Sequence, residues 1–322
     1  MRAAVCLRAG DPEVIEVRHI PRPAIKDGWS VIEVKGFGLN RSELMTRQGH
    51  SPNVVFPRVL GIECVGVIAE SATLPVGAKV AAIMGEMGRE FDGGYAEYAL
   101  LPDSLLMPVR TDLDWETFAA LPETYLTTQG SLDVLGIAAG GRLLVRGGTS
   151  SVGMAALSMA KGHGVETAAT TRREDKSKAL RAGGADHVVL DHGDDLAEQV
   201  RGIWPDGPDY ILDLVGAPTT VDSLHLVRAG GTVCVSGMLS GSWAIPSFEP
   251  VAMIPSGTKL TAYHSDDFKG AAGASALQRI LDEVAAGTYQ PNIDRVFRLD
   301  DIVEAHRYME ANQATGKVIA VP

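Results

Sequence analysis

The sequence has few cysteines and no long hydrophobic run. It contains three cysteines in 322 residues, namely Cys6, Cys64 and Cys234, which form an odd and widely scattered set. Such a set excludes a disulfide framework and fits buried thiols in a reducing compartment. No apolar stretch approaches the length of a membrane span, and the first residues lack the apolar core of a signal peptide. We therefore expect a cytoplasmic protein.

The chain also lacks an excess of positive charge. The chain contains 29 lysines and arginines and 40 acidic residues, which gives a formal net charge of −11. Because no basic stripe stands out, we expect neither nucleic acid nor a membrane surface as a partner. The hydrophobic fraction of 45% is ordinary for a globular protein. The length suits two domains better than one core.

The most informative segment is 142–160, where a short apolar strand leads into a glycine-rich turn and then a helix. Such a corner exposes backbone N–H groups and the positive end of a helix dipole, and it often holds the pyrophosphate of a dinucleotide. The turn matches the fingerprint G-x-G-x-x-G in part, because serine occupies the second glycine position. That serine either pushes the phosphates outward or hydrogen-bonds them, and an ordinary strand–helix turn is the alternative. The predicted diphosphate-binding residues are Gly148, Thr149, Ser150, Ser151, Val152 and Gly153.

Regular alternation of strands and helices after the turn favours the dinucleotide interpretation. Each strand is too apolar to have one face in water, which is typical of parallel strands covered by helices. Right-handed crossovers then give an α/β, doubly wound (Rossmann) sheet of six strands with its ligand at the carboxyl ends. The expected strands are 143–145, 165–170, 187–190, 210–214, 232–236 and 260–263.

The end of the second strand indicates which dinucleotide binds. NAD sites usually carry an acidic residue there, whereas this chain has Thr171, Arg172 and Arg173. Arginine can fork onto a phosphate, and Lys176 adds a further positive charge, so the sequence favours NADPH. The alternative is a solvated basic cluster neutralised by the acidic pair 174–175.

Residues 1–120 read as a separate β-barrel-like domain. Short strands alternate there with many prolines and glycines. The last segment contains two helices and a strand, and we expect it to return to this domain. The predicted domains are therefore 1–120 completed by 265–322, and 121–264. The expected strands of the first part are 3–7, 14–18, 30–37, 62–69 and 78–83, and the tail elements are 276–286, 302–313 and 317–322.

Short motifs occur in a fixed order along nearly the whole chain. They lie at 38–43, 57–66, 92–98, 121–128, 148–153, 183–187 and 316–318. In this order they resemble the medium-chain dehydrogenase/reductase superfamily, specifically the zinc-independent quinone oxidoreductase (zeta-crystallin-like) branch. The resemblance implies a GroES-like substrate domain, a Rossmann domain, NADPH as cofactor and a homodimer joined through the last Rossmann strands.

Two positions differ from the zinc-using relatives. Asn40 stands where those relatives have a cysteine, and Ile62 stands where they have a histidine. A catalytic zinc needs three cysteine, histidine or carboxylate ligands, which these residues cannot supply. Without a Lewis acid, oxidation of an alcohol is disfavoured. Reduction of an electrophilic acceptor, a quinone or an activated C=C bond, remains.

The resemblance also implies roles for single residues. Asn40 would donate its amide to the acceptor carbonyl, or it caps the helix that starts at Arg41. Thr127 would lie near the nicotinamide ribose, or it is an ordinary mid-helix threonine. Lys317 would reach the cofactor, or it is a solvated residue at a strand end. Residues expected along the adenosine–ribose path are Val215, Ser236 and Gly237.

Five further residues have weaker assignments. Tyr263, His264 and Ser265 are expected to face the nicotinamide, although Tyr263 could instead pack at a dimer edge and His264 could be a surface imidazole. Met45 occupies a position where quinone reductases often have a tyrosine, which favours a non-aromatic or bulky enone. His50 is either a proton donor or an exposed loop histidine.

The sequence thus predicts an NADPH-dependent, zinc-independent reductase of quinones or α,β-unsaturated carbonyls. One alternative is an enoyl-thioester reductase, which would need a basic surface from Arg41, Arg47 and Arg58. An alternative of another class is a non-catalytic NADPH-binding protein, as lens crystallins of this family are. That protein would bind the cofactor without turnover.

Overall fold

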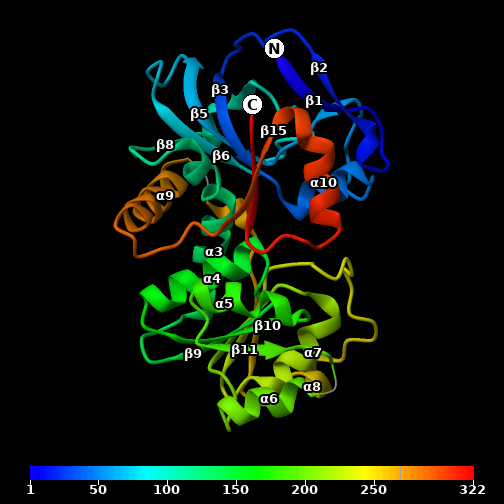
Figure 1. Cartoon of the computed structure of the whole chain (residues 1–322), viewed down its shortest axis with the longest axis vertical. Coiled ribbons are helices and arrows are strands. Elements are labelled where there is room, and N and C mark those ends of the chain that lie inside the picture. Colours follow the sequence, from blue (N-terminus) through cyan, green and yellow to red (C-terminus); the bar gives the residue numbers. More distant parts are fainter. Residues whose placement is uncertain (194, 269) are drawn as a thin grey trace. The chain divides into compact units, whose positions relative to one another are not determined.

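The computed structural model describes residues 1–193, 195–268 and 270–322. The chain divides into two compact units (Figure 1). The barrel unit comprises Met1–Leu126, Ser265–Ala286 and Ile293–Pro322, and the Rossmann unit comprises Thr127–His264 and Gly287–Asn292. In the described part of the chain, no helix combines the length and the apolar character that crossing a membrane requires.

The Rossmann unit contains a six-stranded sheet in which every neighbouring pair is parallel, in the order β11-β10-β9-β12-β13-β14. This order confirms the predicted doubly wound sheet, because the chain steps outward from β9 in one direction and then in the other. The strands are β9 (Arg142–Arg146), β10 (Glu166–Thr171), β11 (His187–Leu190), β12 (Tyr210–Asp213), β13 (Thr232–Val235) and β14 (Lys259–Ala262).

Helices cover both faces of this sheet (Figure 1). Helices α4 (Ser151–Gly162) and α5 (Ser177–Ala182) lie on one face, and α6 (Leu196–Ile203) and α7 (Ala217–Leu226) lie on the other. The consecutive strand residues 143–145 are completely buried, as strands covered on both sides require. The remaining helices of the chain are α1 (Arg41–Arg47), α2 (Trp115–Ala119), α3 (Pro122–Leu135), α8 (Pro250–Met253), α9 (Gly270–Ala285) and α10 (Ile302–Glu310).

The barrel unit is built on β3 (Trp29–Gly38), the longest of its strands. The first half of β3 pairs with β7, its last residues pair with β16, and β5 lies along its other edge. Two register shifts between β3 and β5 bend the ladder, which gives the curvature of a GroES-like barrel. The other strands are β1 (Arg2–Cys6), β2 (Ile15–His19), β4 (Arg58–Val59), β5 (Glu63–Glu70), β6 (Lys79–Ile83), β7 (Tyr98–Pro102), β8 (Met107–Pro108), β15 (Ile293–Arg298) and β16 (Lys317–Val321).

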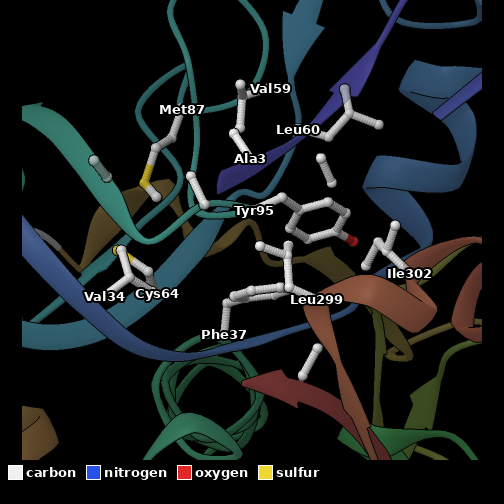
Figure 2. Close-up of a cluster of buried hydrophobic side chains, with 14 of the residues drawn as sticks. Ala3, Val34, Phe37, Val59, Leu60, Cys64, Met87, Tyr95, Leu299 and Ile302 are labelled. Carbon is white, nitrogen blue, oxygen red and sulfur yellow. The ribbon is translucent and has the colours of Figure 1, made fainter. Parts of the chain in front are cut away.

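An apolar core closes the barrel unit around Tyr95 (Figure 2). The Tyr95 ring packs on Phe37 of β3 with centroids 4.7 Å apart. From the tail, Leu299 and Ile302 join the same cluster, and both are fully buried. The tail segment therefore contributes two strands, β15 and β16, to the sheet and apolar side chains to the core of this unit.

Candidate functional site

The glycine-rich turn between β9 and α4 is held by its own serine. Ser150 is the N-cap of α4: its Oγ accepts from the Gly153 N–H at 3.1 Å and donates to the Gly147 carbonyl at 2.8 Å. This hydroxyl is a local cap, as serine at this position often is. The Ser150 side chain is thus engaged inside the turn, and its effect on the phosphates stays a prediction.

Three glycines let the turn fold this tightly. Gly147 has a φ of +80°, in the left-handed region that favours glycine. A Cβ on Gly148 would come within 2.8 Å of the Ala169 side chain. A Cβ on Gly153 would lie 2.7 Å from the carbonyl oxygens of Gly147 and Gly148. These contacts place the first turn of α4 directly against the end of β9.

The first N–H groups of α4 point out of the helix end. Ser151 and Val152 are the first two helical residues, and intrahelical bonding leaves such donors unpaired. Within the part of the chain that the structure describes, neither N–H meets a backbone or side-chain acceptor. Both residues, and Thr149 before them, are partly exposed. The turn therefore presents an anion site at the carboxyl edge of the sheet.

Two arginines follow the tip of β10 and differ in their contacts. The Arg173 guanidinium binds Asp175 at 3.0 Å, as the alternative of a neutralised cluster predicted. Arg172 is exposed and has no ion pair or hydrogen bond among the residues that the structure describes. Thr171 accepts the Arg173 N–H at 3.1 Å and so fixes the bend of this loop. Lys176 is 9% exposed, so it is not a solvated cation.

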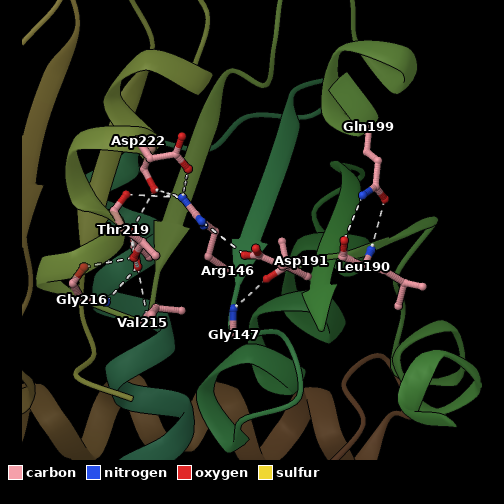
Figure 3. Close-up of polar contacts among 12 residues, drawn as sticks. Arg146, Gly147, Leu190, Asp191, Gln199, Val215, Gly216, Thr219 and Asp222 are labelled. Carbon is pink, nitrogen blue, oxygen red and sulfur yellow. Dashed lines mark hydrogen bonds and ion pairs between the residues drawn. The ribbon is translucent and has the colours of Figure 1, made fainter. Parts of the chain in front are cut away.

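A network of charged side chains around the buried Arg146 lies at this edge (Figure 3). Arg146 ends β9, and its guanidinium contacts Asp191, Asp222 and Ser223. Opposite it on β12, the carboxylate of Asp213 accepts hydrogen bonds from the turn that follows and from two hydroxyls of α7. The sequence analysis assigned no role to these residues. An arginine and an aspartate at the ends of apolar strands were the available signal.

The residues predicted along the adenosine–ribose path lie at the ends of β12 and β13. Val215 is partly exposed, and its N–H donates to Asp213 at 3.0 Å. Ser236 donates to the Tyr263 carbonyl at 3.2 Å and accepts from Ser131 at 2.9 Å. A Cβ on Gly237 would meet the Leu214 carbonyl at 2.5 Å. All three lie at the predicted edge, and contact with a ribose stays a prediction.

Three more predicted cofactor residues belong to the Rossmann unit. Thr127 lies within α3 and is 6% exposed. Tyr263 is 8% exposed, and its ring packs on Gly130 of α3, where a Cβ would lie 2.0 Å from the ring. Its packing is thus internal to the unit. His264 is exposed, which agrees with the alternative of a surface imidazole.

In the barrel unit, Asn40 belongs to a cluster with Glu43, Glu63 and Lys317. The Lys317 Nζ donates to Asn40 Oδ1 at 2.7 Å and to Glu63 Oε1 at 2.6 Å. The Asn40 Nδ2 donates to Glu63 Oε1 at 3.0 Å, with a longer contact of 3.4 Å to Glu43 Oε1. The cation therefore fixes which way the amide is turned. Lys317 is 1% exposed, so the alternative of a solvated lysine is wrong.

Glu43 closes this cluster from α1. One oxygen accepts the Asn40 N–H at 3.0 Å, and the other accepts the Ile62 N–H at 3.0 Å. Asn40 does cap α1, as the alternative predicted, but through its backbone N–H and this carboxylate. Burial raises the pKa of Glu43 to about 7. A Cβ on Gly38 would overlap Glu63 and Lys317, at 2.1 and 2.3 Å, so the cluster requires glycine there.

The other predicted residues of this unit lie outside the cluster. Ser265 is buried and donates to Glu123 at 3.3 Å. Met45 is partly exposed on α1, and His50 is exposed just after that helix. Their contacts with a substrate stay predictions.

The three arginines proposed for a thioester-binding surface do not form one. Arg47 is completely buried, with Glu310 and the Gly10 carbonyl as partners. Arg58 binds Asp92 at 3.0 Å and is 16% exposed. Arg41 donates to Asn312. Because Arg47 has no exposed surface, it cannot belong to such a surface, and the enoyl-thioester alternative stays a prediction.

Within residues 1–193, 195–268 and 270–322, no three histidine, cysteine or acidic side chains are arranged to hold a metal ion. Ile62 is buried beside the Asn40 cluster, and its contribution there is a backbone N–H. Glu43 and Glu63 stood inside motifs of the sequence without an assigned role. Acidic residues next to buried apolar ones were the signal that could have identified them.

Comparison with known proteins covers both units. A model for the alcohol dehydrogenase GroES-like domain matches residues 26–111, and a model for zinc-binding dehydrogenases matches residues 183–319. Human quinone oxidoreductase is 29% identical over 99% of this chain and 97% of its own length.

Solved structures agree over the whole chain. A mycobacterial protein in complex with NADPH is 25% identical with a TM-score of 0.88, and an NAD-dependent alcohol dehydrogenase is 28% identical with a TM-score of 0.87. Each match covers 100% of both chains. These similarities, with the anion site on the Rossmann sheet, support an oxidoreductase that uses a nicotinamide cofactor. The chain belongs to the medium-chain dehydrogenase/reductase superfamily, in its quinone oxidoreductase branch.

Proposed function

We propose that the protein is a zinc-independent, NADPH-dependent reductase of quinones or α,β-unsaturated carbonyls. Two observations carry this proposal: the anion site at the N-terminus of α4, and Arg172 at the tip of β10, which has no partner among the residues that the structure describes. The quinone oxidoreductase relatives and the NADPH complex of a similar protein support the same assignment.

The residues at the carboxyl edge fit NADPH. The outward N–H groups of Ser151 and Val152 would hold the diphosphate, where the helix dipole favours negative charge. The Arg172 guanidinium would bind the 2′-phosphate, because its donors are not committed to another residue that the structure describes. A Cβ at Gly148 or Gly153 would disturb the turn that presents these groups.

The reaction adds two electrons and two hydrogens to the acceptor. When bound, NADPH would supply the hydride, and solvent would supply the balancing proton. As the hydride reaches the electrophilic carbon, negative charge develops on the acceptor oxygen. A positioned N–H donor stabilises such charge.

Asn40 would be that donor, and the cluster around it explains how. The Lys317 cation on Oδ1 draws electron density from the amide and strengthens Nδ2 as a donor. The Nδ2 contact to Glu43 is long, at 3.4 Å, so this hydrogen is the one available to an acceptor oxygen. Neither Asn40 nor Ile62 can replace a thiolate or imidazole on zinc, which supports a zinc-independent reaction.

The free edge of β14 supports a homodimer. In the described part of the sheet, β14 pairs with β13 alone; its first and last residues are exposed, and the two between them are partly exposed. An uncovered edge strand offers hydrogen-bonding groups to a second copy. We propose that two copies pair along this edge, which sedimentation of the purified protein would test. A monomeric species at micromolar concentration would contradict it.

Turnover of NADPH with a panel of quinones and enones tests the activity. We expect oxidation of NADPH, followed by its absorbance, and little with NADH. Arg172→Ala should reduce the preference for NADPH, whereas Lys178→Ala, an exposed cation on α5, should not. Tight NADPH binding without oxidation by any acceptor would instead favour the non-catalytic alternative.

A further inference from the structure

Arg146 is a buried cation at the cofactor edge of the Rossmann sheet. It is the last residue of β9 and directly precedes the glycine-rich turn, yet its side chain is only 4% exposed. Its Nη1 donates to Asp222 at 2.5 Å and to Ser223 at 3.1 Å, and its Nη2 donates to Asp191 at 3.2 Å (Figure 3). Its partners therefore come from the end of β11 and from α7.

One branch of this network leads to the loop proposed for the 2′-phosphate. Asp191 directly follows β11, and its N–H donates to the Thr171 carbonyl at 2.9 Å. Thr171 in turn accepts the Arg173 N–H at 3.1 Å. The carboxylate that Arg146 neutralises thus belongs to a residue bonded to this loop. Without Arg146, the Asp191 carboxylate would place an uncompensated negative charge next to the loop that contains Thr171.

The other branch leads to the turn after β12. Ser223 accepts from Arg146 and donates to Asp213 at 2.8 Å. Asp213 is completely buried and accepts the N–H groups of Val215 and Gly216, each at 3.0 Å. Arg146 is therefore connected to the turn expected to line the adenosine–ribose path, as well as to the Thr171 loop.

Charge balance shows what the arginine does for a phosphorylated ligand. Arg146 lies among three carboxylates, those of Asp191, Asp213 and Asp222. A 2′-phosphate brings roughly −1.5 to −2 further charges at neutral pH. A dinucleotide without this phosphate brings no charge to that ribose. Loss of the cation would therefore penalise the phosphorylated dinucleotide more than the other.

We propose that Arg146 is a positioning residue that allows this edge to accept a 2′-phosphorylated dinucleotide, by neutralising Asp191 and fixing the Thr171–Arg173 loop. The inference rests on the proposed NADPH preference and deepens it, because the selectivity then depends on a buried residue that needs no contact with the phosphate. The exposed Arg172 would attract the 2′-phosphate, and the buried Arg146 would cancel the repulsion between that phosphate and the Asp191 carboxylate.

The test is the ratio of the Kd for NADH to the Kd for NADPH, measured by calorimetry. Arg146→Met should lower this ratio about fivefold to tenfold at low salt and less at high salt, since charges near a surface are screened within roughly 10 Å. The matched control is Arg142→Met, which removes an aspartate-paired arginine from the other end of the same strand. That variant should leave the ratio unchanged.

A rescue variant separates charge from structure. In the double variant Arg146→Met, Asp191→Asn, the uncompensated charge is gone, so the ratio should return towards that of the wild type. Should Arg146→Met fail to fold, Asp191→Asn alone should raise the ratio, because a carboxylate near the phosphate loop is removed. Equal losses for both cofactors in Arg146→Met, or an unchanged ratio in Asp191→Asn, overturn the inference. A wild-type protein without preference for NADPH overturns the cofactor proposal itself.

Discussion

Replacing Lys317 by methionine should destabilise the barrel unit far more than replacing an exposed lysine. Methionine keeps the length of the side chain and removes the cation from the Asn40 cluster. Glu63 is also 1% exposed and would be left as a buried charge. Removing one partner of a buried pair costs about 3–5 kcal/mol. Glu63 keeps hydrogen bonds from Asn40 and Glu123, which offset part of this loss, so we expect about 3 kcal/mol.

The assay is urea unfolding read by hydrogen exchange of peptides from β3 and β16, which report on the barrel unit alone. The matched control is Lys35→Met. Lys35 also pairs with a glutamate, Glu33, but the two side chains are 34% and 39% exposed. We expect that control to cost less than about 1 kcal/mol. The double variant Lys317→Met, Glu63→Gln should recover most of the loss. Equal effects of Lys317→Met and Lys35→Met would refute the reasoning.

Four other variants test single features. Gly38→Ala should unfold the barrel unit at lower urea than the wild type because its Cβ would overlap Glu63, whereas Gly202→Ala, with open space around it, should not. Burial raises the pKa of Glu43 to about 7, so stability should fall as pH rises from about 4.5 to 7, and Glu43→Gln should flatten that slope in thermal melts. Burial lowers the pKa of His306 to about 3, so stability should fall as pH drops from 6.5 to 3, and His306→Gln should remove this loss; an unchanged acid slope would contradict it. Ser150→Ala should lose about 1 kcal/mol through the missing cap and weaken cofactor binding in calorimetry, and equal affinities would speak against the turn as the phosphate site.

The Rossmann sheet could be predicted from the sequence because its signals are local. Runs such as 143–145 and 188–190 are apolar without alternation, and turns separate them. The strand boundaries confirmed these positions to within a residue or two. The glycine-rich turn was predicted from an equally local signal, since Gly148 and Gly153 lie five residues apart. The sequence did not show that the Ser150 side chain would form its hydrogen bonds within the turn.

The charged clusters could not be predicted, because their members are distant in the sequence. Lys317 and Glu63 are 254 residues apart, and Arg146 and Asp222 are 76 apart. No spacing rule connects such pairs, and burial depends on the packing of whole elements. For the same reason, the sequence left open that Lys317 is solvated, and it predicted Arg47 at the surface. Both are buried by the elements around them.

The place of β16 inside its sheet has a consequence for synthesis. This strand lies between β15 and β3, so an early strand of the barrel pairs with a strand that is translated long after it. Until Lys317 leaves the ribosome, Glu63 lacks the cation it pairs with here, and the last residues of β3, Phe37 and Gly38, lack their neighbour β16. Nascent chains arrested before residue 317 should therefore carry a folded nucleotide-binding unit beside an open, protease-sensitive barrel.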